Sequence, residues 1–366
     1  MSYFVFGIGI ILSQFYFYKS GIPQPSHYLM IFPLIWYFVS SRRFIITPAN
    51  QNVPKILMIF FIYSLIVNSI YFVIYEKNEF LWSSFYVFYG LLVFLLVQNL
   101  SLNKLEGLNS ISFYAFIGLL VLLVIGVFGY GEYKFYPRYN GYFNDPNQMA
   151  FWVLCVLSIV IANKSGGLLV KGVAFFCGFY LILLTASRSG SIGFLFVLVG
   201  FLLNLINNIS KLSSLHKSIF VLSVFVGILF FVFFINSELM LYLMSRVDEV
   251  DASAQADARG YARIINFPEY LLTGSGQGYD DRFDAVGAEI HSTWVGLLFY
   301  YGVPGLMLIC VVVYMIMSKL ELNEKIIFMG PLFYGFSTYG LRTPIVWVFI
   351  GFFYSLGLLQ KRSNVT

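Results

Sequence analysis

The chain is a series of long apolar runs separated by short charged or Pro- and Gly-rich breaks. The clearest runs cover Ile56–Tyr75, Ser110–Tyr130 and Ser218–Asn236. Strands of a membrane barrel alternate polar and apolar side chains over about ten residues, whereas these runs are continuously apolar. Because backbone groups in lipid must be satisfied within helices or a closed barrel, the pattern predicts membrane-spanning helices.

The whole chain, residues 1–366, is expected to form a single transmembrane domain of all-α, polytopic class. One large outer loop, residues 237–291, interrupts it. The N-terminus lacks a basic segment and a cleavage site, so the first run is expected to be a retained span. Twelve spans are predicted, at 3–18, 26–40, 54–75, 80–99, 110–130, 148–163, 168–186, 189–207, 218–236, 292–317, 326–341 and 343–360.

Composition supports the membrane assignment. Hydrophobic residues make up 59% of the chain and charged residues only 11%, whereas soluble domains carry about 25% charged residues. The cysteines, Cys155, Cys177 and Cys310, all lie inside apolar runs and are expected to pack as small hydrophobes. No spacing of His, Cys or Asp predicts a metal site, and Asp280-Asp281 alone is weak evidence for one.

The distribution of basic residues predicts which side each loop faces. With both termini in the cytoplasm, the inner loops hold twelve basic and three acidic residues, and the outer loops hold ten basic and fourteen acidic residues. This asymmetry is the one that the positive-inside rule requires. Nine of the twelve inner basic residues are lysines, whereas seven of the ten outer ones are arginines: Arg138, Arg188, Arg246, Arg259, Arg263, Arg282 and Arg342.

Arginine is preferred where a planar fork must bind a phosphate or a carboxylate. The outer arginines therefore suggest an anion site, although pairing with loop carboxylates would also explain them. No predicted span carries Asp or Glu in its interior, which weighs against an ion-coupled transporter.

Residues 131–147 form the first candidate segment. They are rich in aromatic residues, with Arg138 in the middle and Asn147 at the start of the next span. Asn147 or Asp145 could simply cap that helix, and the aromatics could be interfacial belt residues. The more specific interpretation is that these aromatic rings stack on a sugar.

Arg188 defines the second segment, a tight turn of small residues between two apolar runs. An arginine at this boundary can snorkel to the interface. The small neighbours would equally let a phosphate approach the guanidinium, which we favour.

The large loop is the third segment. A helix is predicted through Ala254–Ile265, which would place Arg259 and Arg263 on one face. Asp257 and Glu249 could neutralise these arginines, or a diphosphate could do so.

The loop ends at Glu289 and His291, directly before a span that contains Pro304. A histidine at a helix end is commonly only a polar residue that ends the helix, without a catalytic role. Its position beside Glu289 makes proton transfer or anion binding an alternative.

Four elements of the chain resemble the bacterial O-antigen polymerase and O-antigen ligase family. These are Arg138 with Gly141–Asn147, Thr185–Gly190 around Arg188, Arg259 ahead of the Gly274–Gly278 turn, and His291-Ser292 followed after nine residues by Gly302-Val303-Pro304-Gly305. The resemblance covers about residues 130–310. Tyr261 and Asn266 depart from the family pattern, so either Arg259 or Arg263 could be the family arginine.

The resemblance implies a C-type (GT-C-like) membrane glycosyltransferase of the bacterial inner membrane that needs no metal or other cofactor. Its donor and acceptor would be undecaprenyl-diphosphate-linked oligosaccharides, and the site would lie at the periplasmic face. The residues that match the family's essential ones are Arg188, Arg259 (or Arg263) and His291. We expect His291, Arg188 and Glu289 to be catalytic, since either His291 or Glu289 could take the proton of the acceptor hydroxyl. The expected substrate-binding residues are Arg138, Arg259, Arg263, Asn147 and Arg342.

Four functions stay open at this point, and one of them is a non-catalytic membrane scaffold, which would not explain the outer arginines. A polymerase would transfer the growing chain onto a lipid-linked repeat unit, a ligase would transfer it onto lipid A–core, and a flippase would only translocate it. Polymerase is favoured because the chain is short and divergent outside the motifs. Membrane lipids and a chain-length regulator protein are candidate partners, and no nucleic acid is expected.

Overall fold

The computed structural model describes residues 2–18, 23–39, 51–102, 105–208, 242, 259–283 and 289–363. Within these ranges all regular secondary structure is helical. The chain divides into two compact units, and Pro25–Val39 (α2) is shared between them. Unit 1 comprises Met1–Phe32, Lys104–Val250 and Glu321–Tyr334, and unit 2 comprises Pro33–Asn103, Asp251–Leu320 and Gly335–Thr366.

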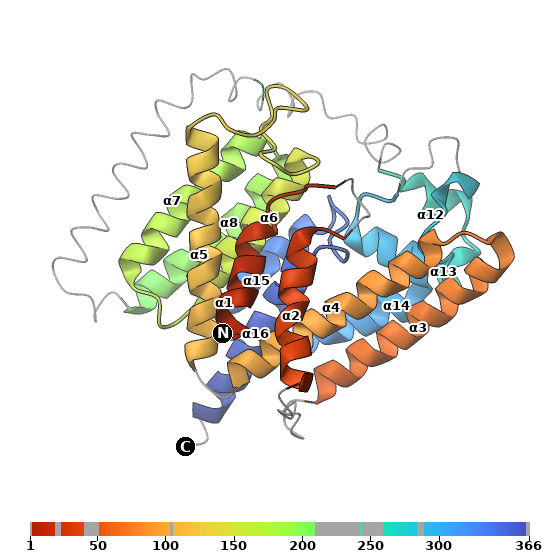
Figure 1. Ribbon diagram of the computed structural model, residues 1–366, viewed down its shortest axis with the longest axis horizontal. Coiled ribbons are helices and arrows are strands. Elements are labelled where there is room, and N and C mark those ends of the chain that lie inside the picture. The colour runs from red at the N-terminus through yellow and green to blue at the C-terminus, as the bar shows by residue number, and fades with distance from the viewer. Residues whose placement is uncertain are drawn as a thin grey trace. The chain divides into compact units, whose positions relative to one another are not determined.

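Unit 1 is a helical bundle in which α6 is buried along nearly its whole length (Figure 1). Its closest helix pair is α8 and α15, which run antiparallel with glycines at the contact. A Cβ on Gly193 would lie 3.1 Å from the carbonyl oxygen of Gly330, so only small residues allow this approach. The helices are α1 (Ser2–Leu12), α5 (Leu105–Val127), α6 (Pro146–Ala162), α7 (Leu168–Thr185), α8 (Arg188–Asn208) and α15 (Leu322–Tyr334).

In unit 2, the helices α4 (Glu79–Leu102) and α16 (Pro344–Ser363) pack in parallel, with Gly90 of α4 against Trp347 of α16. The long helices are α3 (Asn52–Tyr75), α4 (Glu79–Leu102), α14 (Thr293–Met317) and α16 (Pro344–Ser363) (Figure 1). Short helices form the outer loop: α12 (Ala262–Asn266), α13 (Tyr270–Thr273) and the 3-10 helix η2 (Asp280–Arg282).

Most of the predicted spans coincide with helices of the described chain, whereas the span predicted at 218–236 lies outside the described residues. Seven of the described helices are long and apolar enough to cross a membrane: α3, α4, α5, α7, α8, α14 and α16. α1 and α6 are apolar but shorter. The protein is therefore a helical chain of the kind found in polytopic membrane proteins.

Three helix predictions are wrong in extent. The span predicted at 3–18 ends at Leu12, because the chain turns there and the backbone N–H of Tyr16 donates to the carbonyl of Tyr142. The span predicted at 326–341 ends at Tyr334, because the main-chain carbonyls of Gly335 and Thr338 turn to accept hydrogen bonds from the backbone N–H of Thr293. The helix predicted through residue 265 does not include Arg259, because Gly260 adopts a φ of +73° and the helix begins only at Ala262.

α14 is interrupted at Gly302, which has a φ of +64°. Pro304 follows, and its missing N–H leaves the carbonyl of Tyr300 without its intrahelical donor. The break therefore divides α14 into an N-terminal segment of residues 293–301 and a C-terminal segment of residues 303–317.

In each unit, the loops that were predicted to share a side of the membrane meet at one end. In unit 1, Arg138 contacts Thr185 at one end, and Lys164 contacts Glu321 at the other. In unit 2, Glu289 contacts Arg342. These contacts agree with the alternating direction that successive spans require.

Candidate functional site

The outer loop of unit 2 is attached to the break in α14. The backbone N–H of Ser275 donates to the carbonyl of Phe299 at 3.0 Å, and that of Gly276 donates to the carbonyl of Tyr300 at 2.9 Å. The loop thus supplies the donors that the helix break removes. Gly276 has a φ of +68°, a conformation that glycine adopts without strain.

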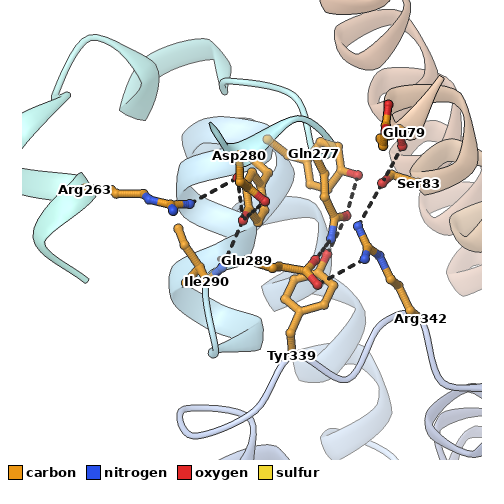
Figure 2. Close-up of polar contacts among 11 residues, drawn as sticks. Glu79, Ser83, Arg263, Gln277, Asp280, Glu289, Ile290, Tyr339 and Arg342 are labelled. Carbon is orange, nitrogen blue, oxygen red and sulfur yellow. Dashed lines mark hydrogen bonds and ion pairs between the residues drawn. The ribbon is translucent and has the colours of Figure 1, made fainter. Parts of the chain in front are cut away.

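A buried ion pair holds this loop from within. Arg263 Nη1 lies 3.1 Å from Asp280 Oδ1, and both side chains are almost fully buried (Figure 2). The hydroxyl of Tyr300 donates to Asp280 and accepts a 3.0 Å hydrogen bond from the backbone N–H of Ile290. Arg263 is therefore committed to a carboxylate of its own loop.

Burial, and to a smaller extent the nearby carboxylate of Glu289, raise the pKa of Asp280, and the net value is about 7. Arg263 and the Tyr300 hydroxyl act in the opposite direction. Burial prevails, so Asp280 titrates close to neutral pH.

A second network surrounds Glu289. One carboxylate oxygen accepts a hydrogen bond from the side-chain amide of Gln277, and the other lies 3.0 Å from Arg342 Nη1 (Figure 2). Arg342 also donates to Ser83 Oγ at 3.0 Å, which links the segment before α16 to the start of α4. Glu289 and Arg342 therefore neutralise each other.

Gln277 is the centre of this network. Its amide oxygen accepts hydrogen bonds from the hydroxyls of Tyr301 at 3.1 Å and Tyr339 at 2.8 Å. Its backbone N–H donates to Asn68 Oδ1 at 2.9 Å, in the interior of α3. Through its side-chain amide and its backbone N–H, Gln277 thus joins the loop to α14, to α3 and to the segment before α16.

Arg282 is also held inside the loop. Its guanidinium donates to the backbone carbonyls of Ser275 and Gly276. It also stacks on a group of aromatic rings at 4.5–5.3 Å from their centroids: Tyr71, Tyr75, Phe80 and Phe283. This cation–π group stabilises the loop.

His291 and Arg259 lie side by side at the surface of the same unit. The backbone N–H of His291 donates to the carbonyl of Arg259 at 3.2 Å. His291 is exposed and Arg259 half-buried. Ser292, the next residue, caps α14 by accepting the backbone N–H of Val295, so both predicted residues lie at the N-terminus of that helix.

In unit 1, Arg138 connects two of the predicted segments. Its Nη2 donates to Asn147 Oδ1 at 2.8 Å, and its Nε donates to the carbonyl of Thr185 at 3.0 Å. Asp145, and not Asn147, caps α6, because its carboxylate accepts the backbone N–H groups of Asn147 and Gln148. Asn147 is consequently left to bind Arg138.

Arg188 is the first residue of α8. Ala186 ends α7 in the left-handed conformation, with a φ of +46°. Ser187 follows, and its hydroxyl accepts the backbone N–H of Gly190 and lies 3.1 Å from the hydroxyl of Tyr334. The small residues of this turn allow α7 to stop and α8 to start within two residues.

The predicted residues thus form one set in each unit. Arg138, Asn147 and Arg188 belong to unit 1, and the other five belong to unit 2: Arg259, Arg263, Glu289, His291 and Arg342. Sequence reasoning missed Gln277, Tyr300 and Tyr339. Asn68, a polar residue inside an apolar span, was the available signal for this network.

Comparison with known protein families finds no family that matches the sequence, and comparison with curated proteins finds no match. Among the described residues, no group of three or more His, Cys, Asp or Glu side chains is arranged to hold a metal ion. The function is accordingly argued from the geometry of the two sets.

Proposed function

We propose that the protein is a membrane glycosyltransferase that polymerises a lipid-diphosphate-linked glycan at the outer face of the membrane. One observation carries the proposal. Two long apolar helices begin at the predicted outer face beside basic side chains: Arg188 opens α8, and His291 and Arg259 lie at the start of α14. The described first turns of both helices contain no acidic residue.

This arrangement suits an anion. A helix N-terminus carries partial positive charge and attracts anions, and a guanidinium group at the same place adds to that positive charge. A diphosphate leaving group develops negative charge as the glycosidic bond breaks, and guanidinium groups stabilise that charge through paired hydrogen bonds. In unit 1 we assign this role to Arg188, with Arg138 and Asn147 shaping the turn beside it. In unit 2 we assign an anion-binding role of the same kind to Arg259.

The transfer needs a base as well. The acceptor hydroxyl oxygen forms a bond to the anomeric carbon, the bond from that carbon to the diphosphate oxygen breaks, and the hydroxyl proton passes to the base. His291 is exposed, whereas Glu289 already accepts hydrogen bonds on both carboxylate oxygens. We therefore assign the base role to His291.

Arg263, Glu289 and Arg342 have a supporting role in this proposal. Each is part of an internal ion pair of unit 2, so each acts through the shape of the loop that presents Arg259 and His291. The proposal also includes twelve spans, a C-type glycosyltransferase fold, a bacterial inner-membrane location and cytoplasmic termini.

The test is incubation of the purified protein with undecaprenyl-diphosphate-linked repeat units alone. A polymerase produces a ladder of products without any lipid A–core. A ladder-free reaction that transfers glycan only when lipid A–core is added would identify a ligase instead. Movement of the lipid-linked glycan across vesicles without any new glycosidic bond would identify a flippase.

Two variants test the assigned residues in the same assay. Arg188→Ala should lower the rate by about 10²–10³-fold, as loss of an anion-stabilising group does. His291→Ala should lower it by about 10²-fold or more. Lys134→Ala, which removes an exposed basic side chain of the outer loop in unit 1, is the matched control. Full activity of Arg188→Ala would refute the diphosphate assignment.

A further inference from the structure

A cavity of about 450 Å³ lies at the predicted inner end of unit 1, where α6 ends and α7 begins. This volume is in the range of small-ligand sites, roughly 300–1,000 Å³. The first residues of α15 and the last turns of α8 complete its wall. The polar lining comes from Lys164, Lys171, Asn204, Glu321, Asn323 and Glu324.

Lys171 is the side chain that needs explanation. It is only 6% exposed, yet within the described residues no hydrogen bond or ion pair joins its ammonium to another side chain. It also lies in the first turn of α7, where a cation is unfavourable. A buried ammonium is costly unless an anion pairs with it.

The carboxylates of the cavity are engaged by a different lysine. Lys164 Nζ lies 2.5 Å from Glu321 and 3.6 Å from Glu324. Glu324, which is 1% exposed, also accepts the backbone N–H of Glu321 at 3.0 Å and so caps α15. The cavity thus contains both signs of charge. No carboxylate is in direct contact with Lys171, although the charge of Glu324 acts on it from a greater distance.

We propose that this cavity binds the zwitterionic phosphoethanolamine head group of a membrane phospholipid. The phosphate would pair with Lys171 and the N-terminus of α7, and the ammonium would share the carboxylate oxygens of Glu321 and Glu324 with Lys164. A simple anion would meet two carboxylates and a simple cation would meet two lysines, whereas a zwitterion matches both pairs.

The position of the cavity favours a lipid over a free solute. It lies at the ends of α7 and α8, two helices that are long and apolar enough to span a membrane. Apolar side chains at the same level are exposed: Leu169 by 62% and Ile206 by 64%. Acyl chains of a bound lipid would cover such side chains. The proposal does not depend on the glycosyltransferase assignment.

The experiment is native mass spectrometry of the full-length protein in detergent, titrated with phosphatidylethanolamine or with phosphatidylglycerol of the same acyl chains. Phosphatidylethanolamine is expected to bind about tenfold more tightly, the effect of one charge-assisted hydrogen bond. Equal binding of the two lipids would overturn the zwitterion assignment.

Variants locate the site. Lys171→Met keeps the apolar stem but removes the charge, and it should weaken phosphatidylethanolamine binding about tenfold. Lys325→Met is the matched control, because Lys325 lies near the same helix end and does not line the cavity. Unchanged binding by Lys171→Met would overturn the proposal, and so would equal weakening by both variants.

Two further measurements complete the test. Lys171→Arg keeps a cation in place and should retain binding, which separates loss of the site from misfolding; thermal unfolding of every variant is recorded in the same detergent. Soluble phosphoethanolamine should displace the bound lipid only at much higher concentration. If it binds as tightly as the lipid, the cavity takes a free solute and the lipid assignment is wrong.

Discussion

The outer loops of the two units are held in place by different chemistry. In unit 2, arginines are paired with carboxylates of the same unit, as Arg263 is with Asp280 and Arg342 with Glu289. In unit 1, Arg138 donates to two neutral oxygens, the side-chain amide of Asn147 and the carbonyl of Thr185. Removing one partner of a buried charge pair leaves an uncompensated charge, which costs more free energy than leaving a neutral hydrogen-bonding group without its partner.

The difference shows how an outer arginine should be interpreted. An arginine whose carboxylate partner is buried with it supports the loop, even where its sequence position suggests substrate binding. Arg263 is such a case, because Asp280 and Tyr300 enclose it. The comparison predicts a graded series of effects on stability.

The largest effect is expected at the buried pair. Arg263→Ala leaves the Asp280 carboxylate without its cation and should destabilise the protein by about 3–5 kcal/mol. Thermal unfolding in detergent at pH 8, where Asp280 is ionised, measures the change. Lys55→Ala, at an exposed residue of the same unit, is the control. If the two variants unfold at the same temperature, the pair does not hold the loop.

Arg342→Ala should have the next largest effect, about 2 kcal/mol, since it removes hydrogen bonds to Glu289 and Ser83. Arg342→Lys can keep only one of these contacts and should give an intermediate unfolding temperature. A double-mutant cycle with Glu289→Gln isolates the pair. A coupling energy of zero would show that the two side chains act independently.

The pKa of Asp280 predicts a pH dependence of stability. The folded protein holds this proton up to about pH 7, whereas the unfolded chain releases it near the ordinary pKa of 3.8. The free energy of unfolding should therefore fall as the pH rises from about 4 to 7, and one pKa unit corresponds to about 1.4 kcal/mol. Comparison of unfolding at pH 4.5 and 7.5 tests this. Asp280→Asn should lack the dependence, and an unchanged profile in that variant would assign it to another group.

The smallest effect on stability is expected in unit 1. Arg138→Ala removes hydrogen bonds to neutral acceptors and should destabilise the protein by about 1 kcal/mol. Polymer formation should fall more than stability does, because the turn beside Arg188 loses its support. Parallel measurement of unfolding temperature and ladder formation checks this ratio. If Arg138→Ala lowered the free energy of unfolding as much as Arg263→Ala does, the two units would not differ in how their arginines stabilise them.

Much of the helical fold could be predicted from the sequence, since continuous apolar runs determine where helices form in a chain of this kind. Helix ends were predicted less well. Nothing near Tyr334 in the sequence shows that Gly335 and Thr338 accept a hydrogen bond from Thr293, about forty residues away. The span at 326–341 was too long for this reason.

The candidate site was predicted as a set of residues but not as an arrangement. Sequence spacing placed Arg259 and Arg263 on one helix face, whereas Gly260 separates them and only Arg263 lies in α12. Its partner, Asp280, is 17 residues away, and only the folded loop brings the two together. By contrast, the proximity of Arg138 to the turn before Arg188 follows from packing of α6 against α7.

The glycine at the break in α14 has a mechanical consequence. A Cβ on Gly302 would lie 2.7 Å from the carbonyl oxygen of Leu272, and one on Gly274 would lie 2.4 Å from that of Tyr300. The loop and residues 293–301 of α14 therefore touch backbone to backbone. Any side chain at either glycine would push the two apart and would break the hydrogen bonds from Ser275 and Gly276 to the carbonyls of Phe299 and Tyr300.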